Sequence, residues 1–403
     1  MSSSPPAERN LVLVFGATGA IGKPLLAALT AKHGALTCVA ALRRTPLPAG
    51  PLRGAVLEAA GVDLRDAASV ARVVREYAPR LRAVWNLAAP LSVETEADPA
   101  VADDVTVGGM QRLIAAMDEA QLPASTRLLF SDSIGSFGAS APKNNADAAW
   151  LCAHPEQGAR HFRGILTLLE FSFQRHVHCT HARSSPLADP GSAYGLQKRR
   201  CRELLAASKY DTRFAVIPGV LHDQAEWGGG TTEYALELLK AFHQAHAALD
   251  APPVTWHCPV RAASVLPMIH SDDLIAGLVA LTDAARDALH EPQNGYAFAG
   301  FSFAARDLVH VLQRRLQDSD SAAAQLPQQQ QQDEADSVIG NMRVVYPPAA
   351  ADGAALRFAD MWPDSISGAA ALRDLAWAPE HASSLDAVAR RILDAHASRH
   401  AIK

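Results

Sequence analysis

The stretch LVLVFGATGAIGKPLLAAL, residues 11–29, limits most narrowly what this chain can fold into. Its five leading apolar residues predict a buried strand, and the apolar pattern of helical period that follows predicts a helix with Pro24 in its first turn. Between them stand Gly16, Gly19 and Gly22, at three-residue spacing. We expect Gly16 to permit a tight turn, Gly19 to let a pyrophosphate approach the helix N-terminus, and Gly22 to let helix and strand pack closely.

Strand-like and helix-like runs alternate through the first 140 residues of the chain. The expected strands lie within residues 11–15, 36–43, 55–66, 83–90 and 127–138, and the clearest expected helices span residues 67–77 and 108–121. Because parallel neighbouring strands need crossover connections, this alternation predicts the α/β class with a Rossmann-type, doubly wound parallel sheet.

Two segments interrupt this rhythm. Residues 141–190 mix Cys, His, Pro and polar residues, and residues 317–337 form a glutamine-rich tract of low complexity that is too polar to offset its ordering entropy. We interpret both as insertions, the first of which loops out of the fold. The sequence therefore predicts a dinucleotide-binding domain at residues 10–220 and a smaller, mainly substrate-binding C-terminal subdomain at residues 221–400, with some segments that return to the sheet.

The composition excludes some classes of partner. A net charge of −5 over 403 residues is too mild for a nucleic-acid-binding surface or a cationic membrane-binding surface. No run approaches the roughly 18 apolar residues that a membrane span needs. We therefore expect a small-molecule substrate, no nucleic acid and no membrane. The polar start MSSSPPAERN favours a cytoplasmic location, with the mitochondrial matrix as the alternative.

The choice of dinucleotide depends on the end of the second strand. In NAD sites of this architecture that strand ends in an acidic residue, which binds the ribose 2′-OH. Here Ala41 stands near that position, and Arg43 and Arg44 follow. The arginines either accept the 2′-phosphate of NADP or are solvated surface charges; the sequence favours the second, so NAD is expected and NADP stays open. We expect Asp63 to accept the adenine amino group, or else to cap a helix, which Asp66 would do equally well.

Three residues point to oxidation of an alcohol. Ser133 follows an expected strand, and Tyr194 and Lys198 stand four positions apart in YGLQK, on one helix face. A tyrosine ordinarily titrates near pH 10, so a neighbouring ammonium and an oxidised nicotinamide are needed to favour the phenolate. Tyr194 then accepts the hydroxyl proton while Ser133 holds the substrate oxygen. Taken singly, Ser133 is a turn serine and Tyr194 a core aromatic.

The motifs GATGAIG, NLAA, SDSIGSFG and YGLQK occur here in the order typical of the extended short-chain dehydrogenase/reductase superfamily, the NAD-dependent epimerases/dehydratases, which the chain resembles. Three further segments, GGGTTEYALELL, VLPMIHSDDLIAGL and FADMWPDSISGAAALRDLAWAP, resemble those of short-chain type L-threonine 3-dehydrogenases. This resemblance implies oxidation of the β-hydroxyl of L-threonine by NAD to L-2-amino-3-oxobutyrate, a step of threonine catabolism, in a homodimer.

The resemblance also places the ligands. The implied cofactor contacts are Gly16, Thr18, Gly19, Ala20, Ile21, Gly22, Arg43, Asp63, Leu64, Leu87, Ala88, Ala89, Tyr194, Lys198 and Pro218. The expected substrate contacts are Ser92, Ser133, Tyr194, Thr231, Thr232, Glu233 and Trp362. A zwitterion needs an anion for its ammonium, which Glu233 supplies, and donors for its carboxylate, which Ser92 and the two threonines supply. Trp362 closes over the substrate methyl group or is a core aromatic, and Pro218 lies near the nicotinamide or only forms a turn.

Alternative interpretations remain at this stage. A nucleotide-sugar epimerase or dehydratase shares the glycines and the Ser, Tyr and Lys set, and a non-catalytic dinucleotide sensor shares the glycines. The stretch RHVHCTHAR offers His176, His178, Cys179 and His181 to a metal, with Cys152 and His154 nearby. No second pair stands at a structural-zinc spacing, so we predict no metal.

Overall fold

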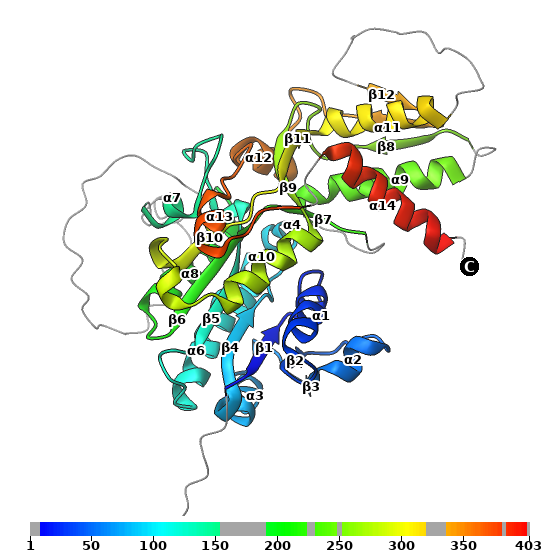
Figure 1. Cartoon of the computed structure of the whole chain (residues 1–403). Coiled ribbons are helices and arrows are strands. Elements are labelled where there is room, and N and C mark those ends of the chain that lie inside the picture. The colour runs from blue at the N-terminus through cyan, green and yellow to red at the C-terminus, as the bar shows by residue number, and fades with distance from the viewer. Residues whose placement is uncertain are drawn as a thin grey trace, which may run out of the picture.

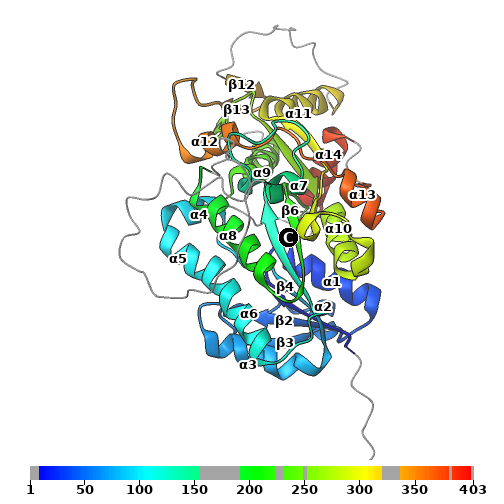
Figure 2. The same ribbon diagram turned by 90° about the vertical axis from the view of Figure 1, so that its left-hand side faces the viewer.

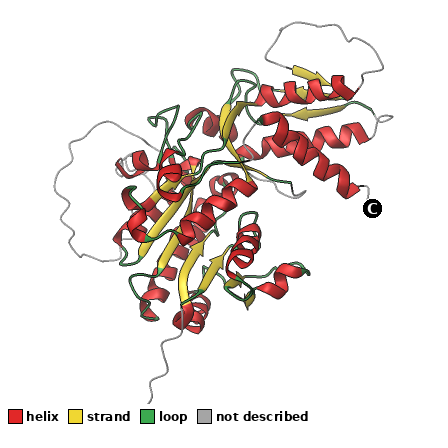
Figure 3. Ribbon diagram, viewed as in Figure 1, coloured by secondary structure: helices red, strands yellow, loops and turns green. Residues whose placement is uncertain are grey.

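The computed structural model describes residues 9–153, 191–223, 230–247, 252–319, 336–380 and 384–400. Its largest sheet contains the strands β1 (Leu11–Phe15), β2 (Cys38–Leu42), β3 (Leu57–Ala60), β4 (Leu81–Asn86), β5 (Arg127–Ser133), β6 (Asp211–Ile217) and β10 (Gly295–Ala297). Their order is β10-β6-β5-β4-β1-β2-β3, and every neighbouring pair is parallel (Figures 1 and 3). This confirms the predicted α/β class with a Rossmann-like parallel sheet.

Helices cover both faces of this sheet (Figure 2). Successive side chains of β1 alternate between two buried apolar clusters, one on each face, as the two-residue period of a strand requires. One cluster includes side chains of α3 (Ala67–Tyr77), α6 (Gly109–Glu119) and α8 (Ala193–Ala207), and the other includes side chains of α1 (Gly22–His33) and α10 (Ser271–Asp283). The central strands are therefore buried on both sides, which explains why they read as continuous apolar runs.

The connections within the first domain differ from the expected helices in one place. The helix expected at residues 67–77 has those bounds, but the one expected at residues 108–121 is α6, which ends at Glu119. It continues directly from a π-helical turn at Asp104–Gly108, preceded by α5 (Pro99–Asp103) and α4 (Ser92–Ala97). A short α2 (Pro51–Ala55) lies between β2 and β3.

The C-terminal half adds two small sheets. The first contains β7 (Gly219–Leu221), β9 (Val265–His270) and β11 (Phe301–Ala304), and the second β8 (Val254–His257), β12 (Asp336–Ile339) and β13 (Met342–Val345). The helices of this half are α9 (Tyr234–Ala247), α11 (Ala305–Ser319), α12 (Ala354–Met361), α13 (Ala369–Leu375) and α14 (Leu385–His400). Strand β10 returns from this half to pair with β6. Within the described ranges, no helix combines the length and apolar character that crossing a membrane requires.

The start of the segment expected to loop out packs instead against the C-terminal part of the chain. Nζ of Lys143 donates to the carbonyl oxygens of Asp360 (2.6 Å) and Trp362 (2.8 Å), and Ala146 forms a β-bridge with Ile366. Helix α7 (Ala148–Ala153) follows. Residues 141–153 are thus part of the fold because they have backbone partners far along the chain. Residues 154–190, and residues 320–335 of the second expected insertion, lie outside the described ranges.

Candidate active site

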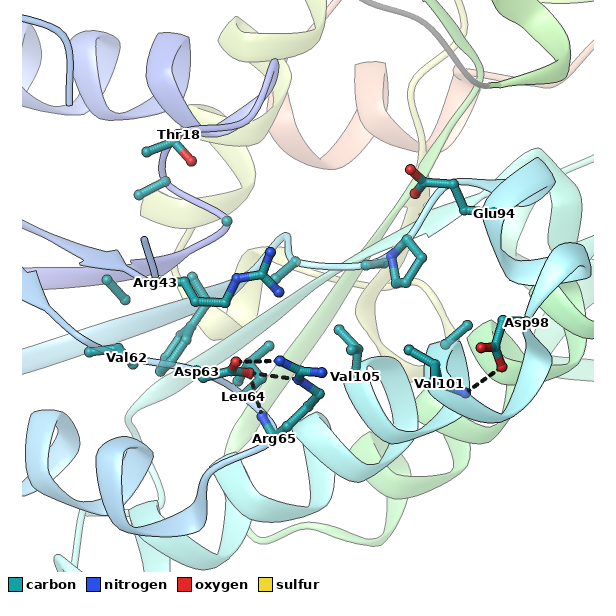
Figure 4. A pocket seen from close by; sticks show the side chains of 18 residues that line it. Thr18, Arg43, Val62, Asp63, Leu64, Arg65, Glu94, Asp98, Val101 and Val105 are labelled. Atoms are coloured by element: carbon teal, nitrogen blue, oxygen red, sulfur yellow. Dashed lines mark hydrogen bonds and ion pairs between the residues drawn. The ribbon is translucent and has the colours of Figure 1, made fainter. Parts of the chain in front are cut away.

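The order of strands reverses between β1 and β4, since β2 and β3 follow on one side and β5 and β6 on the other. Ligands of open α/β sheets bind at such a reversal, outside the carboxyl ends of the strands. A cleft of about 530 Å³ lies there (Figure 4). Its walls include several of the predicted dinucleotide contacts: Gly16, Thr18, Arg43, Asp63, Leu64, Ala88 and Ala89.

The loop from β1 to α1 has the shape of a phosphate cradle. Gly16 has a φ of 77°, and a Cβ on it would lie 2.9 Å from the backbone nitrogen of Ala88; a Cβ on Gly22 would lie 2.1 Å from the carbonyl oxygen of Gly16. The N-cap residue Ile21 offers no side-chain acceptor, and the nitrogen of Lys23 donates to the carbonyl oxygen of Gly19 (3.0 Å). Since Pro24 has no N–H, the N–H of Gly22 is the one in the first turn of α1 that the described residues leave for an anion. These features fit the pyrophosphate of a dinucleotide. Gly19 and Ala20 lie in the same loop.

Charged side chains meet at the other end of the cleft, beside the ends of β2 and β3 (Figure 4). Arg65 donates to Asp63 through Nε (3.2 Å to Oδ1) and Nη2 (2.8 Å to Oδ2). Hydrogen bonding from Arg65 lowers the pKa of Asp63 to about 2. The carboxylate predicted to accept the adenine amino group therefore already binds a guanidinium. Asp66, whose side chain accepts from the nitrogen of Ala68 (3.0 Å), is the cap of α3.

Helix α8 brings Tyr194 and Lys198 to the carboxyl end of β5. The Lys198 side chain is buried, and its Nζ donates to the carbonyl oxygen of Ser131 (2.7 Å). The same Nζ lies 5.2 Å from the centroid of the Tyr194 ring. Ser192 caps the helix by accepting from the nitrogen of Gly195 (3.0 Å), which starts α8 just before Tyr194. The ammonium is thus fixed beside the phenol.

Ser133 ends β5 and begins the turn on which the Tyr194 ring lies. Its hydroxyl accepts from the nitrogen of Gly135 (3.2 Å), as a turn serine does. A Cβ on Gly135 would lie 2.9 Å from Cδ1 of Tyr194 and 3.4 Å from Cζ2 of Trp362. The three predicted catalytic residues therefore gather at the ends of β5 and α8. The described walls of the 530 Å³ cleft include none of the three.

A buried ion pair that the sequence analysis did not single out anchors α8 to this place. Arg202 binds Asp132, and their side chains are 6% and 0% exposed. Asp132 also accepts from the hydroxyl of Ser136 and from the nitrogen of Ser133 (2.9 Å). A sequence signal existed, because Arg202 stands one helical turn after Lys198 and so shares its face.

Glu96 is a second residue that sequence reasoning missed. Its Oε1 accepts from the backbone nitrogen of Tyr194 (3.2 Å), which connects α4 to the first turn of α8. The two residues are 98 positions apart, so no local pattern marks their contact. The carboxylate adds to the contacts that hold the N-terminus of α8 against the sheet.

The residues predicted to bind the polar groups of the substrate come from two segments. Ser92 is the first residue of α4 and is 6% exposed. Thr231, Thr232 and Glu233 form a 3-10 turn before α9. A Cβ on Gly219, which follows Pro218, would lie 2.7 Å from Cβ of Thr232, so this turn packs on the start of β7. Leu87 lies beside the cleft, after β4, and its nitrogen donates to the oxygen of Phe15 (3.1 Å).

The position of Trp362 is compatible with both interpretations that the sequence left open, a core aromatic and an indole beside the substrate. Its ring stacks on Phe358, with centroids 5.8 Å apart, and it is 4% exposed, as a core aromatic would be. The same indole lies beside Tyr194 over Gly135. Its Nε1 is buried and has no hydrogen-bond partner in the described part of the chain. The indole is therefore both packed and adjacent to the predicted catalytic tyrosine.

Most of the metal ligands that the sequence offered lie outside the described residues. Of them only Cys152 belongs to the described residues; His154, His176, His178, Cys179 and His181 lie outside. Among residues that the structure describes, no group of three His, Cys, Asp or Glu side chains could hold a metal ion.

Comparison with known proteins agrees with this geometry. Residues 12–155 match the NAD dependent epimerase/dehydratase family. An uncharacterized epimerase/dehydratase of Staphylococcus aureus (strain USA300) is 25% identical over 297 residues, which cover 72% of this chain and 76% of that protein. The matched range contains all of β1 except Leu11, the glycine-rich loop and Ser133.

Solved structures with the same fold include two different activities. The L-threonine dehydrogenase from Phytophthora infestans has a TM-score of 0.68 at 23% identity and covers 96% of this chain and 99% of its own. The UDP-glucose 4-epimerase from Thermus thermophilus, in complex with NAD, has a TM-score of 0.59 at 16% identity and covers 94% and 98%. At such identities the likeness establishes the fold alone. The glycine-rich loop and the family match make residues 12–155 similar to the NAD dependent epimerase/dehydratase family.

Proposed function

We propose that this chain oxidises the β-hydroxyl of L-threonine to L-2-amino-3-oxobutyrate with NAD or NADP as the oxidant. The observation that carries the proposal is the position of Lys198: its buried Nζ lies 5.2 Å from the Tyr194 ring centroid and is held there by the Ser131 carbonyl. A fixed positive charge beside the ring stabilises the phenolate, which is the form that can act as a base.

The chemistry of the chain's own residues follows from this arrangement. Tyr194 accepts the proton of the substrate hydroxyl as the C–H bond on the same carbon breaks. Ser133 donates a hydrogen bond to the substrate oxygen, for which its hydroxyl keeps its proton, since it acts only as an acceptor toward Gly135. The oxidised nicotinamide, when bound, accepts the hydride. Lys198 keeps the positive charge in place during the proton transfer.

The choice of an amino acid over a nucleotide sugar depends on two substrate segments. GGGTTEYA, residues 228–235, and MWPDSI, residues 361–366, contain hydroxyls, carboxylates and an indole but no arginine. A uridine diphosphate would need arginines for its phosphates, whereas a zwitterion needs the carboxylate of Glu233 and the hydroxyls beside it. The similarity of fold to L-threonine dehydrogenases supports the same choice. The homodimer and the cytoplasmic location stay predictions.

Steady-state kinetics with purified protein test the proposal. We expect L-threonine with NAD or NADP to generate the absorbance of reduced nicotinamide, and Tyr194→Phe to remove it. Interconversion of UDP-galactose and UDP-glucose without a threonine-dependent signal would instead establish the epimerase alternative. Dinucleotide binding with neither reaction would favour the non-catalytic sensor.

A further inference from the structure

The end of β2 presents no carboxylate to the cleft. Ala41 and Arg43 both line the cleft, whereas Leu42 between them belongs to the apolar cluster on the opposite face of the sheet. These two positions are therefore the ones from which a β2 side chain can reach a bound ribose. An NAD site places an acidic residue there to accept from the 2′-OH.

The carboxylates that line the cleft elsewhere already have donors. Asp63 binds Arg65, Glu94 accepts from the nitrogen of Leu91 (3.1 Å), and Asp98 accepts from the nitrogen of Val101 (3.1 Å). The last two acceptors stabilise the starts of α4 and α5. Figure 4 shows Glu94 and Asp98 on the opposite side of the cleft from Arg43, and Asp63 binds Arg65 with both oxygens. Along the described walls, no acidic side chain is thus placed to replace the missing β2 carboxylate.

Two guanidinium groups occupy this end of the cleft instead. The Arg43 side chain is exposed and has no hydrogen bond or ion pair with any residue that the structure describes. Figure 4 shows it extending into the cleft on the side of the Asp63–Arg65 pair. Arg65 uses Nε and one Nη2 hydrogen toward Asp63, which leaves three of its five N–H donors for another acceptor. Asp63 thereby fixes where the Arg65 group lies.

We propose that this cleft selects NADP over NAD, with Arg43 and Arg65 as the ligands of the 2′-phosphate. Two guanidinium groups and one carboxylate leave a net charge of +1 where the phosphate monoester brings a charge of about −1.5 to −2. Arginine forms bidentate, charge-assisted hydrogen bonds with phosphate, whereas the 2′-OH of NAD finds no carboxylate acceptor. The inference depends on the proposed dinucleotide site and not on which alcohol is oxidised.

Titration of the purified protein with NADPH and with NADH, followed by the fluorescence of the reduced nicotinamide, tests this without turnover. We expect the Kd of NADPH to be at least about tenfold lower than that of NADH, since only NADPH brings a phosphate that accepts charge-assisted hydrogen bonds from the two arginines. Arg43→Ala should raise the Kd of NADPH by about tenfold or more and change that of NADH by less than about twofold. Arg44→Ala is the matched control. It removes the same charge from the next residue in the chain, which does not line the cleft.

Several results would overturn the inference. The first is that NADH binds as tightly as NADPH or more tightly. The second is that Arg43→Ala and Arg44→Ala lose equal amounts of NADPH affinity. The third is that 5′-AMP displaces NADPH as effectively as adenosine 2′,5′-bisphosphate does. Failure of both dinucleotides to bind would reject the inference together with the cofactor site. An Arg43-dependent preference for NADPH without oxidation of L-threonine would support the inference and reject the proposed substrate.

Discussion

The two halves of the candidate site are built in different ways. The nucleotide cleft is formed by neighbouring loops of one stretch, between Phe15 and Val105, and its phosphate end consists of glycines and backbone groups. The catalytic end is formed by side chains of β5 and α8, which are fixed by a buried ion pair and a buried ammonium. The first recognises a cofactor by the shape of its backbone, and the second requires a few side chains in fixed positions.

This difference indicates where each half is vulnerable. A backbone cradle tolerates changes of side chain as long as its glycines remain, because a Cβ on them would meet backbone atoms. The catalytic end depends on charges removed from water, and a buried charge that loses its partner destabilises the fold strongly. Substitution of Tyr194, or of a residue of the Arg202–Asp132 pair, should therefore change turnover or stability while the cofactor still binds.

The largest effect is expected for Tyr194→Phe. Loss of the base should lower kcat by about 10²- to 10⁴-fold, the range that general acid–base catalysis contributes. The Kd of the dinucleotide should change by less than about twofold, because the ring remains. Tyr77→Phe is the matched control, since Tyr77 ends α3 shortly before the amino end of β4, whereas Tyr194 lies at the carboxyl end of β5. Turnover that survives in Tyr194→Phe would remove the proposed base and the division between the two halves.

The next effect is on stability. Arg202→Met leaves the Asp132 carboxylate buried without its cation, which should lower the free energy of unfolding by about 3–5 kcal/mol in urea titrations. Arg200→Met is the control on the same helix. It removes a pair with Asp103 whose side chains are 44% and 38% exposed, and exposed pairs contribute about 0–1 kcal/mol. Similar losses in the two variants would contradict the importance given to burial.

The nucleotide half was predictable from the sequence because its signals are local. Strand β1, the three glycines and the helix after them are contiguous, and the gathering of strand ends follows from the parallel topology. The state of Asp63 was not predictable. The hydrogen bonds from Arg65 to Asp63 depend on the rotamer of the Arg65 side chain. An aspartate at position 63 can equally well bind adenine or a guanidinium.

The catalytic half could be predicted only as a set of residue types. Ser133, Tyr194 and Lys198 were found by motif. The hydrogen bonds around them, however, join residues that are distant in the chain. Glu96 and Tyr194 are 98 positions apart, and Lys143 and Trp362 are 219 positions apart. The helical or strand periodicity of a sequence does not indicate contacts between residues so far apart. The expectation that residues 141–190 loop out was wrong for 141–153 for the same reason, since their partners lie beyond residue 359.

Substitution of Lys143 should have a smaller effect, which is expected on turnover of the substrate but not on binding of the dinucleotide. Lys143→Met removes hydrogen bonds to the carbonyl oxygens of Asp360 and Trp362, next to the predicted substrate site. Because this side chain is 44% exposed, water replaces part of the loss, and we expect about a tenfold lower kcat/KM for L-threonine, or about 1.4 kcal/mol. Dinucleotide affinity should not change. Lys209→Met, which removes an exposed pair with Asp118, should leave both quantities unchanged.

The smallest expected effect depends on pH. A hydrogen bond from His270, followed by one from Arg391, lowers the pKa of Asp223 to about 2. Arg391 also binds Asp272, so these residues connect α14 to the start of α10.

A carboxyl group whose pKa is depressed in the folded state stabilises that state when the pH is above the pKa of the unfolded chain, which is near 4. This contribution disappears as the pH falls toward 2. Asp223→Asn should therefore cost about 1 kcal/mol at pH 7, after allowance for solvent screening, and the difference from the unmodified chain should shrink between pH 4 and 2. Urea titrations at pH 7, 4 and 3 measure it, and a difference that grows on acidification would contradict the ionic role of Asp223.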